Sequence, residues 1–279
     1  MRIVRTEAIT EAVARLCIEA NLHLPPDVTR RVDAMRERET WGIARDALER
    51  IAENREISAR TGLPMCQDTG MACVFIDIGR DAHIDGDIYA AVNRGVSRGY
   101  ADGLLRKSIV SDPLRRVNSG DNTPAAVYLD FTDGDSVTVT VAPKGFGSEN
   151  MSRVEMLKPA DGEDGVLDFV TRTIELAGAN PCPPIIVGVG IGGNFDKVAL
   201  LAKRALLRSL DEPNRDTYYA ELEARLLTRI NALGIGPQGF GGYTTALGVS
   251  IEAAATHIAG LPCAVNICCH VSRHATAVI

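Results

Sequence analysis

The chain lacks the segments that mark membrane-spanning and exported proteins. Its 279 residues contain no run of the ~18 consecutive apolar residues that a membrane helix needs. Residues 1–20 mix arginine, glutamate and threonine, and they include no apolar core of a signal peptide. We therefore expect a soluble protein of the reducing cytoplasm, where cysteines persist as thiols.

The chain also lacks an excess of positive charge. Lysine and arginine number 30 against 36 aspartates and glutamates, which gives a formal net charge of -6. The arginine-rich stretches are interrupted by acidic residues, so they form no basic stripe that would follow a phosphate backbone. This balance argues against a nucleic-acid-binding protein and is typical of a protein that acts on small molecules.

Paired cysteine motifs are absent as well. The sequence holds seven cysteines and no Cys-x-x-Cys pair. An odd number of cysteines argues against a simple disulfide framework. The missing pairs exclude a zinc ribbon and a ferredoxin-type run.

The cysteines fall into two groups by their surroundings. One group lies among apolar residues and is expected to pack in the core: Cys17, Cys73 and Cys263. The other group lies in polar segments that form turns: Cys66, Cys182 and Cys269. Three thiolates suit an iron–sulfur cluster with one iron left open to substrate, and spacing alone leaves structural zinc as an alternative.

Hydrophobic periodicity indicates an α+β fold. Helical spacing covers 5–21, 41–58, 87–105, 164–178, 196–209 and 215–233, and Pro25-Pro26-Asp27 opens one more helix. A buried strand is expected over 71–78. Two further strands, 125–131 and 136–141, flank Asp133-Gly134, which predicts a β-hairpin. We expect a largely helical single domain over 1–279, of one or two lobes, with small antiparallel sheets and a central cleft.

A glycine-rich segment imitates a dinucleotide-binding motif. Gly188, Gly190 and Gly193 satisfy the spacing Gly-x-Gly-x-x-Gly after the expected strand 185–187. The second strand of a nucleotide fold, which ends in an acidic residue, does not follow. The alternative is that these glycines let the backbone approach a cluster or a substrate closely. A second glycine-rich stretch, 234–245, is expected to be a loop ahead of a small-residue helix or strand over 246–255.

Several polar residues accompany the cysteine turns. Gln67 and Asp68 follow Cys66 directly, and Asp68 can equally form an Asx-turn before Gly70. Arg106 is a candidate for binding a carboxylate, or it belongs to a solvated helix end. The segment 144–150 is glycine-rich directly after a strand, so its amides can form an anion site. His257, taken alone, is more often structural than catalytic.

Taken together, these motifs resemble a known enzyme family. They are Cys66-Gln67-Asp68-Thr69-Gly70, Lys144-Gly145-Phe146-Gly147-Ser148-Glu149-Asn150, Cys182-Pro183-Pro184 with Gly188 to Gly193, and Thr256-His257 leading to Asn266-Ile267-Cys268-Cys269-His270-Val271-Ser272-Arg273-His274. In order and over nearly the whole chain, they resemble the class I fumarate hydratases and L-tartrate dehydratases, which are iron–sulfur hydro-lyases. This likeness raises the expectation of a cluster well above what cysteine spacing supports.

The resemblance implies roles for particular residues. It makes Cys66, Cys182 and Cys269 the ligands of an oxygen-sensitive 4Fe-4S cluster, although Cys268 stands where glutamine is expected and leaves the choice within the Cys268-Cys269 pair open. It implies substrate contacts from Gln67, Asp68, Arg106 and the loop that holds Gly145 and Gly147. It also implies that Asp68 and His257 are the catalytic groups that can pass a proton to the departing water.

The chain is shorter than the single-chain members of this family. Those members continue into a second domain that supplies a threonine base and further basic ligands. The resemblance is therefore to the α subunit of the two-subunit form, and it implies a β subunit as partner in a hetero-oligomer. Malate and fumarate are the expected substrates, with tartrate and oxaloacetate as the alternative; a nucleotide-binding module using Gly188–Gly193 is the alternative from a different class.

Overall fold

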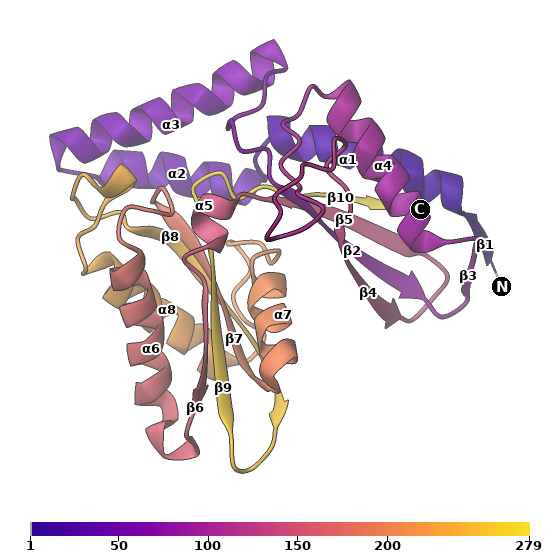
Figure 1. Ribbon diagram of the computed structural model, residues 1–279. Coiled ribbons are helices and arrows are strands. Elements are labelled where there is room, and N and C mark those ends of the chain that lie inside the picture. The colour runs from indigo at the N-terminus through magenta and orange to yellow at the C-terminus, as the bar shows by residue number, and fades with distance from the viewer. Residues whose placement is uncertain (1) are drawn as a thin grey trace. The chain divides into compact units, whose positions relative to one another are not determined.

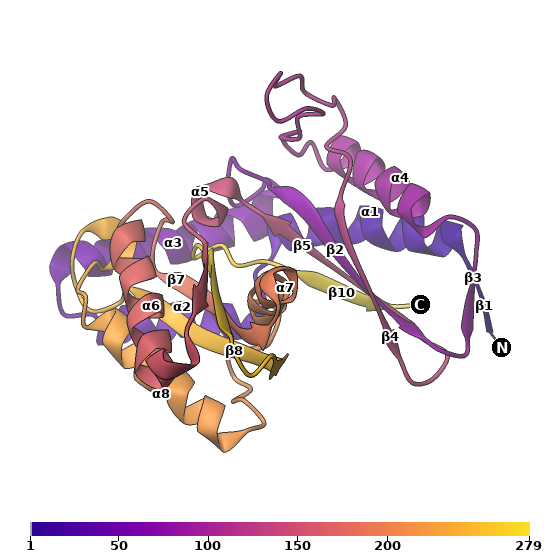
Figure 2. The same ribbon diagram turned by 60° about the horizontal axis from the view of Figure 1, so that its bottom comes forward.

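The computed structural model describes residues 2–279, which form two compact units (Figures 1 and 2). Unit 1 comprises Met1–Pro25, Arg55–Phe146 and Arg273–Ile279, and unit 2 comprises Pro26–Asn54 and Gly147–Ser272. Each unit has its own hydrophobic core built around a four-stranded sheet.

Unit 1 packs two helices on one face of its sheet. The strand order is β10 (Ala275–Val278), β5 (Val137–Lys144), β2 (Met71–Gly79) and β4 (Ala126–Thr132). Helices α1 (Thr6–Leu22) and α4 (Ile88–Asp102) bury apolar residues against it. The side chain of Asp87 caps α4 by accepting from the Ala90 N–H at 3.0 Å. A parallel pair, β1 (Arg2–Arg5) and β3 (Ala82–Asp85), completes the unit.

Unit 2 covers both faces of its sheet. The order is β6 (Arg153–Leu157), β9 (Leu261–Cys268), β7 (Ile185–Gly193) and β8 (Ala246–Thr256). Helices α6 (Gly162–Ala177) and α8 (Thr217–Asn231) share a core with one face, and α7 (Phe195–Ala205) packs on the other (Figure 1). The unit also contains α2 (Pro26–Arg38) and two short 3-10 turns, Pro159–Asp161 and Pro237–Gly239.

Two helices include a position in the sequence at which the chain passes from one unit to the other. They are α3 (Gly42–Thr61) and the short α5 (Phe146–Glu149). Among residues 2–279, no helix combines the length and the apolar character that crossing a bilayer demands.

The α+β class is confirmed, and the long helices lie where periodicity predicts them. The sheets, however, are mixed instead of antiparallel: β2 pairs with β4 in parallel and with β5 in antiparallel fashion, and β7 relates to β8 and β9 in the same way. Parallel pairs need long connections, which local sequence patterns do not reveal.

The predicted hairpin between residues 125 and 141 is wrong. Its two strands exist as β4 and β5, but β2 lies between them in the sheet. The Asp133-Gly134 turn instead crosses the end of β2, where the Asp81 N–H donates to the Gly134 carbonyl at 2.9 Å and the Gly79 N–H donates to the Ser136 carbonyl at 2.8 Å. The turn residues were identified correctly, and their partner is the end of a third strand.

Gly188 and Gly190 of the dinucleotide-like motif lie inside strand β7 and are buried, whereas Gly193 is half-buried at its end. A Cβ on Gly188 would lie 2.1 Å from the Ala202 carbonyl oxygen, and one on Gly190 would lie 2.2 Å from that of Val198. These residues let α7 pack directly onto the strand. Because Gly188 and Gly190 are covered by a helix and lie before the strand-to-helix turn, they offer no phosphate cradle.

Candidate active site

The first part of the candidate site is the turn that follows Cys66 in unit 1. Cys66 is half-buried, and the Asp68 N–H donates to its sulfur at 3.4 Å. The Asp68 carboxylate is held by two backbone donors: Gly70 at 3.0 Å and Phe146 at 2.9 Å. Gly70 has φ of 81°, and a Cβ there would lie 2.7 Å from the Lys144 nitrogen. The glycine thus lets the turn lie directly against the end of β5.

Arg106 is connected to the same turn through its backbone. Its carbonyl accepts from the Thr69 hydroxyl at 3.0 Å. Buried Asn122 accepts from the Ser108 N–H at 2.7 Å and donates to the Gly70 carbonyl at 3.2 Å. The Arg106 side chain is exposed. The structure therefore brings the Arg106 backbone to the turn that holds the Cys66 thiol and the Asp68 carboxylate.

Arg273 joins this group, although sequence reasoning gave it no role. It is 5% exposed, and its Nη2 donates to the Asp68 carbonyl. Its Nε is buried and has no hydrogen-bond partner among the described residues. A buried guanidinium keeps its charge, so this nitrogen is a donor for an anionic group. The signal in the sequence was an arginine four residues after Cys269, inside a motif already noted.

Cys182 and Cys269 lie at one end of the sheet in unit 2. Cys182 precedes β7 and Cys269 follows β9, and these two strands are antiparallel with Ile186 opposite Cys268. Cys182 is exposed and has φ of 54°, a left-handed conformation that is uncommon for a residue with a side chain. Such conformations persist where the surroundings hold them, and they often mark functional sites.

Gln238 and His270 hold the Cys182 turn. The backbone N–H of Gln238 and its side-chain Nε2 donate to the Pro183 carbonyl at 2.7 and 2.8 Å. The Nδ1 of His270 lies 3.0 Å from the Cys182 carbonyl oxygen and 3.3 Å from the side-chain nitrogen of Gln238. Gln238 belongs to the glycine-rich stretch 234–245, whose role the sequence alone did not reveal.

The loop that begins at Lys144 is anchored in unit 2 by a polar cluster. The Glu149 carboxylate accepts hydrogen bonds from the Lys203 Nζ at 2.5 Å and from the Asn266 Nδ2 at 2.7 Å. Asn266 also donates to the Ser152 hydroxyl at 2.8 Å. At the other end of the loop, a Cβ on Gly145 would lie 3.2 Å from the Asp68 carboxylate. Lys203 was not anticipated because it lies in α7, far from any motif.

The structure does not bring His257 to the cysteines of unit 2. His257 is exposed in the turn between β8 and β9, where its Nδ1 accepts from the Ala259 N–H at 3.1 Å. Cys269 follows the other end of β9, a strand of 8 residues. At about 3.4 Å per residue, the two positions are on the order of 25 Å apart. His257 and Cys269 of one chain therefore lie at opposite ends of the sheet.

The remaining cysteines behave as the sequence predicted. Cys17 and Cys263 are fully buried, and desolvation raises the pKa of each thiol to about 12. Cys73 is 4% exposed and Cys268 is 7% exposed, whereas Cys269 is half-buried. The three thiols in the turns are thus the ones that are open to a ligand.

The donor set fits a thiolate-bound iron–sulfur group better than a hard cation. Three thiols lie outside the core, and a backbone N–H is already directed at the Cys66 sulfur. Soft thiolates select zinc, copper or iron–sulfur clusters over magnesium or calcium. In the part of the chain that the structure describes, no three histidine, cysteine or acidic side chains surround a common ion position.

Comparison with known proteins points to one family. A profile described as "Fumarate hydratase (Fumerase)" matches residues 10–278. The "Putative L(+)-tartrate dehydratase subunit alpha" of Methanocaldococcus jannaschii is 42% identical over 275 residues, which cover 96% of each chain. The "L(+)-tartrate dehydratase subunit alpha" of Escherichia coli O157:H7 is 31% identical over 97% of this chain and 90% of its own.

Proposed function

The chain belongs to the fumarate hydratase (Fumerase) family, and it is a hydro-lyase; on this basis we propose that it is the α subunit of an iron–sulfur enzyme that interconverts malate and fumarate. The observation that carries the proposal is the turn after Cys66, which presents a thiol, the Asp68 carboxylate and the Arg106 segment together. Such a grouping suits a substrate that carries both a hydroxyl and carboxylates.

We propose that Cys66, Cys182 and Cys269 hold a 4Fe-4S cluster. Three protein ligands leave one iron open, and that iron supplies Lewis-acid activation of the substrate hydroxyl when the cluster is bound. Cys66 lies in the turn before β2, Cys182 precedes β7 and Cys269 follows β9. His270 and Gln238 would fix the Cys182 backbone for this purpose.

The substrate is a small dicarboxylate in this proposal. Arg106 offers an exposed guanidinium and Arg273 a buried Nε donor, and a planar guanidinium matches a carboxylate well. Gln67 and the amides around Gly145 and Gly147 add neutral donors. Arginine binding orients the substrate, which lowers the entropic cost of reaching the reactive geometry.

Asp68 is the proposed proton carrier for the departing hydroxyl. Its carboxylate is fixed by the Gly70 and Phe146 amides, so its position is set before substrate binds. His257 remains a predicted catalytic residue. Because its turn lies at the far end of the sheet from Cys182 and Cys269, we propose that it acts at the site of another copy.

A partner subunit completes the proposed enzyme. The relatives are named "subunit alpha", which implies at least one other subunit in those proteins. We propose that a β subunit supplies the base that removes the proton from carbon and further cationic ligands. The names also favour a second substrate, tartrate, which would be dehydrated to oxaloacetate.

The decisive experiment measures iron and acid-labile sulfide after anaerobic purification. About four of each per chain are expected in the wild type, with loss in Cys66→Ser, Cys182→Ser and Cys269→Ser. The core variant Cys17→Ala is the control and should retain them. A wild type that contains no iron and cannot be reconstituted would refute the proposal. Parallel kinetics with malate and tartrate, in the presence of the β subunit, would then identify the substrate.

A further inference from the structure

Strand β6 is an open edge of the sheet in unit 2. It pairs only with β9, and four of its five residues are exposed. The Ile267 N–H donates to the Ser152 hydroxyl at 3.1 Å, so the backbone N–H and C=O groups of Ile267, and of the alternate residues Val265 and Cys263, point toward β6. On β6, Arg153 lies opposite Val265 and Glu155 lies opposite Cys263, so the backbone groups of Arg153 and Glu155 bond to β9. The amides of Val154 and Met156 point out of the sheet.

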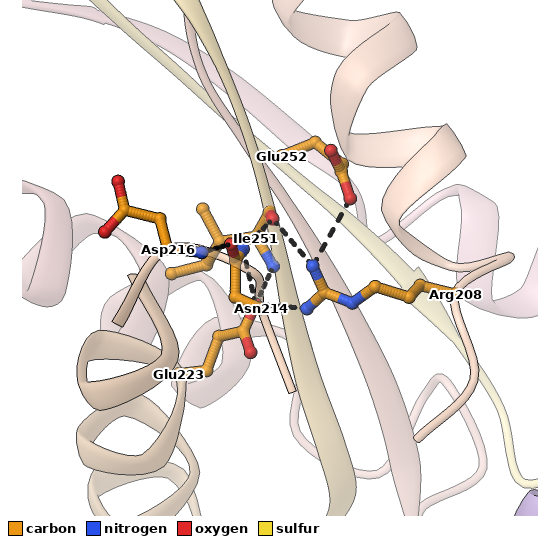
Figure 3. Close-up of polar contacts among 6 residues, drawn as sticks. All are labelled: Arg208, Asn214, Asp216, Glu223, Ile251 and Glu252. Atoms are coloured by element: carbon orange, nitrogen blue, oxygen red, sulfur yellow. Dashed lines mark hydrogen bonds and ion pairs between the residues drawn. The ribbon is translucent and has the colours of Figure 1, made fainter. Parts of the chain in front are cut away.

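Backbone groups on two other edge strands, β8 and β4, are capped by side chains. On β8, the opposite edge of the same sheet, the Ile251 N–H donates to Glu223 at 2.7 Å, and the Ile251 carbonyl accepts from Asn214 at 2.8 Å and Arg208 at 3.2 Å (Figure 3). On β4, the Phe131 N–H donates to the Asp130 side chain at 2.9 Å. Between residues 2 and 279, no side chain or backbone group caps Val154 or Met156 in this way.

The side chains of β6 are arranged in two classes. Arg153 and Glu155 are exposed on one face, and neither forms an ion pair within the described residues. Val154 and Met156 lie on the other face, 40% and 54% exposed. Natural edge strands are blunted by short length, charged side chains, bulges or a cover; β6 is short and carries Arg153 and Glu155, and it has no bulge among its described residues.

We propose that two copies of the chain associate by antiparallel pairing of β6 with β6, about a two-fold axis at Val154. In this register, Arg153 of each copy lies opposite Glu155 of the other copy, which gives two pairs of opposite charge. On the other face of the sheet, Val154 lies opposite Val154 of the second copy. The two valines exchange both of their outward hydrogen bonds. An axis at Glu155 would instead set two glutamates against each other, which is unfavourable. The pair of four-stranded sheets becomes one continuous sheet, an isologous interface.

The test combines a proline substitution with charge reversals on the full-length chain. Val154→Pro removes an outward N–H and leaves the β6–β9 bonds intact. Arg153→Glu and Glu155→Arg each create two repulsive pairs, and the double variant Arg153→Glu/Glu155→Arg restores attraction. The control is Arg50→Glu, since Arg50 is 80% exposed on α3. Mass is measured by light scattering over a dilution series, alone and with the β subunit, with circular dichroism to verify folding.

By light scattering, the wild type and the Arg50→Glu variant are expected to have twice the molecular mass of the Val154→Pro variant, because only the first two form dimers. Each single charge reversal should raise the dissociation constant about tenfold or more, and the double variant should recover most of this loss. A wild type that remains monomeric at every concentration would overturn the proposal. So would single reversals that leave the mass unchanged, or a double variant as weak as its parents. The result does not depend on iron or activity.

Discussion

At the scale of residues, the environment of each cysteine separates possible ligands from core packing. Cys17 and Cys263 have a pKa raised to about 12 by burial, so they remain protonated thiols until the pH approaches that value. A thiolate is the species that binds metal or attacks an alkylating reagent. We expect iodoacetamide at about pH 8 to modify Cys66, Cys182 and Cys269 in the metal-free chain and to spare Cys17 and Cys263.

Mass spectrometry of peptides after limited labelling measures this directly. Labelling of the two core thiols should rise only after the chain is unfolded in denaturant. Equal labelling of all of these cysteines in the native chain would contradict the assignment. Labelling of the turn cysteines should also fall when the cluster is reconstituted.

The role of Asp68 gives a second prediction at this scale. Asp68→Asn preserves the size of the side chain and removes the carboxylate that would transfer a proton. We expect kcat to fall by about a hundredfold or more with iron content unchanged. The control Asp133→Asn alters a carboxylate that is 89% exposed and should leave both quantities as they are. Loss of iron in Asp68→Asn would instead indicate a structural role in the Cys66 turn.

Sequence reasoning found the chemically distinctive residues and missed those that position them. The three turn cysteines, Asp68 and Arg106 stood out because their residue types suit the chemistry. Gln238 and Lys203 did not, since a glutamine in a glycine-rich loop and a lysine on a helix resemble ordinary surface residues. Their importance comes from contacts with Pro183 and Glu149, which are distant in sequence. Only the fold creates these contacts.

At the scale of elements, the edge of β8 depends on one buried carboxylate. Glu223 is 8% exposed, accepts from the Ile251 N–H, and pairs with Arg208. We expect Glu223→Ala to lower the free energy of unfolding by about 3 kcal/mol, because it removes one of the two carboxylate partners of a partly buried arginine and leaves a strand amide unpaired. The control Glu221→Ala changes an exposed residue on the same helix. Urea denaturation measures both; equal stabilities would show that the edge does not need this cap.

The elements themselves were predictable to different degrees. Helices α1, α3 and α6 have clear periodicity, and the sequence located them well. β6 and β9 were not predicted, since β6 has only 5 residues with alternating charges and β9 begins next to Pro262. Strand order was beyond reach as well: β2 separates β4 from β5 because a core, and not a turn, selects the neighbours.

At the scale of the whole molecule, activity should depend on a second polypeptide. The described residues offer cysteines, Asp68 and arginines, and the proposal assigns the base at carbon to the β subunit. We expect the purified chain to bind iron and to turn over malate or tartrate at least about a hundredfold more slowly than the complex with its β subunit. Steady-state kinetics of both preparations, at equal iron content, measures this difference. Full turnover by the chain alone would refute the subunit assignment.

The end of the unit 2 sheet where Cys182 and Cys269 lie has a consequence for the life of the enzyme in a cell. The Cys182 backbone is held by Gln238 and His270, and β7 and β9 pair through contacts of the polypeptide itself. Damage to the proposed oxygen-sensitive cluster would therefore leave this part of the polypeptide folded. An inactivated molecule could then be repaired by renewed iron delivery, which spares the cell the synthesis of a new chain.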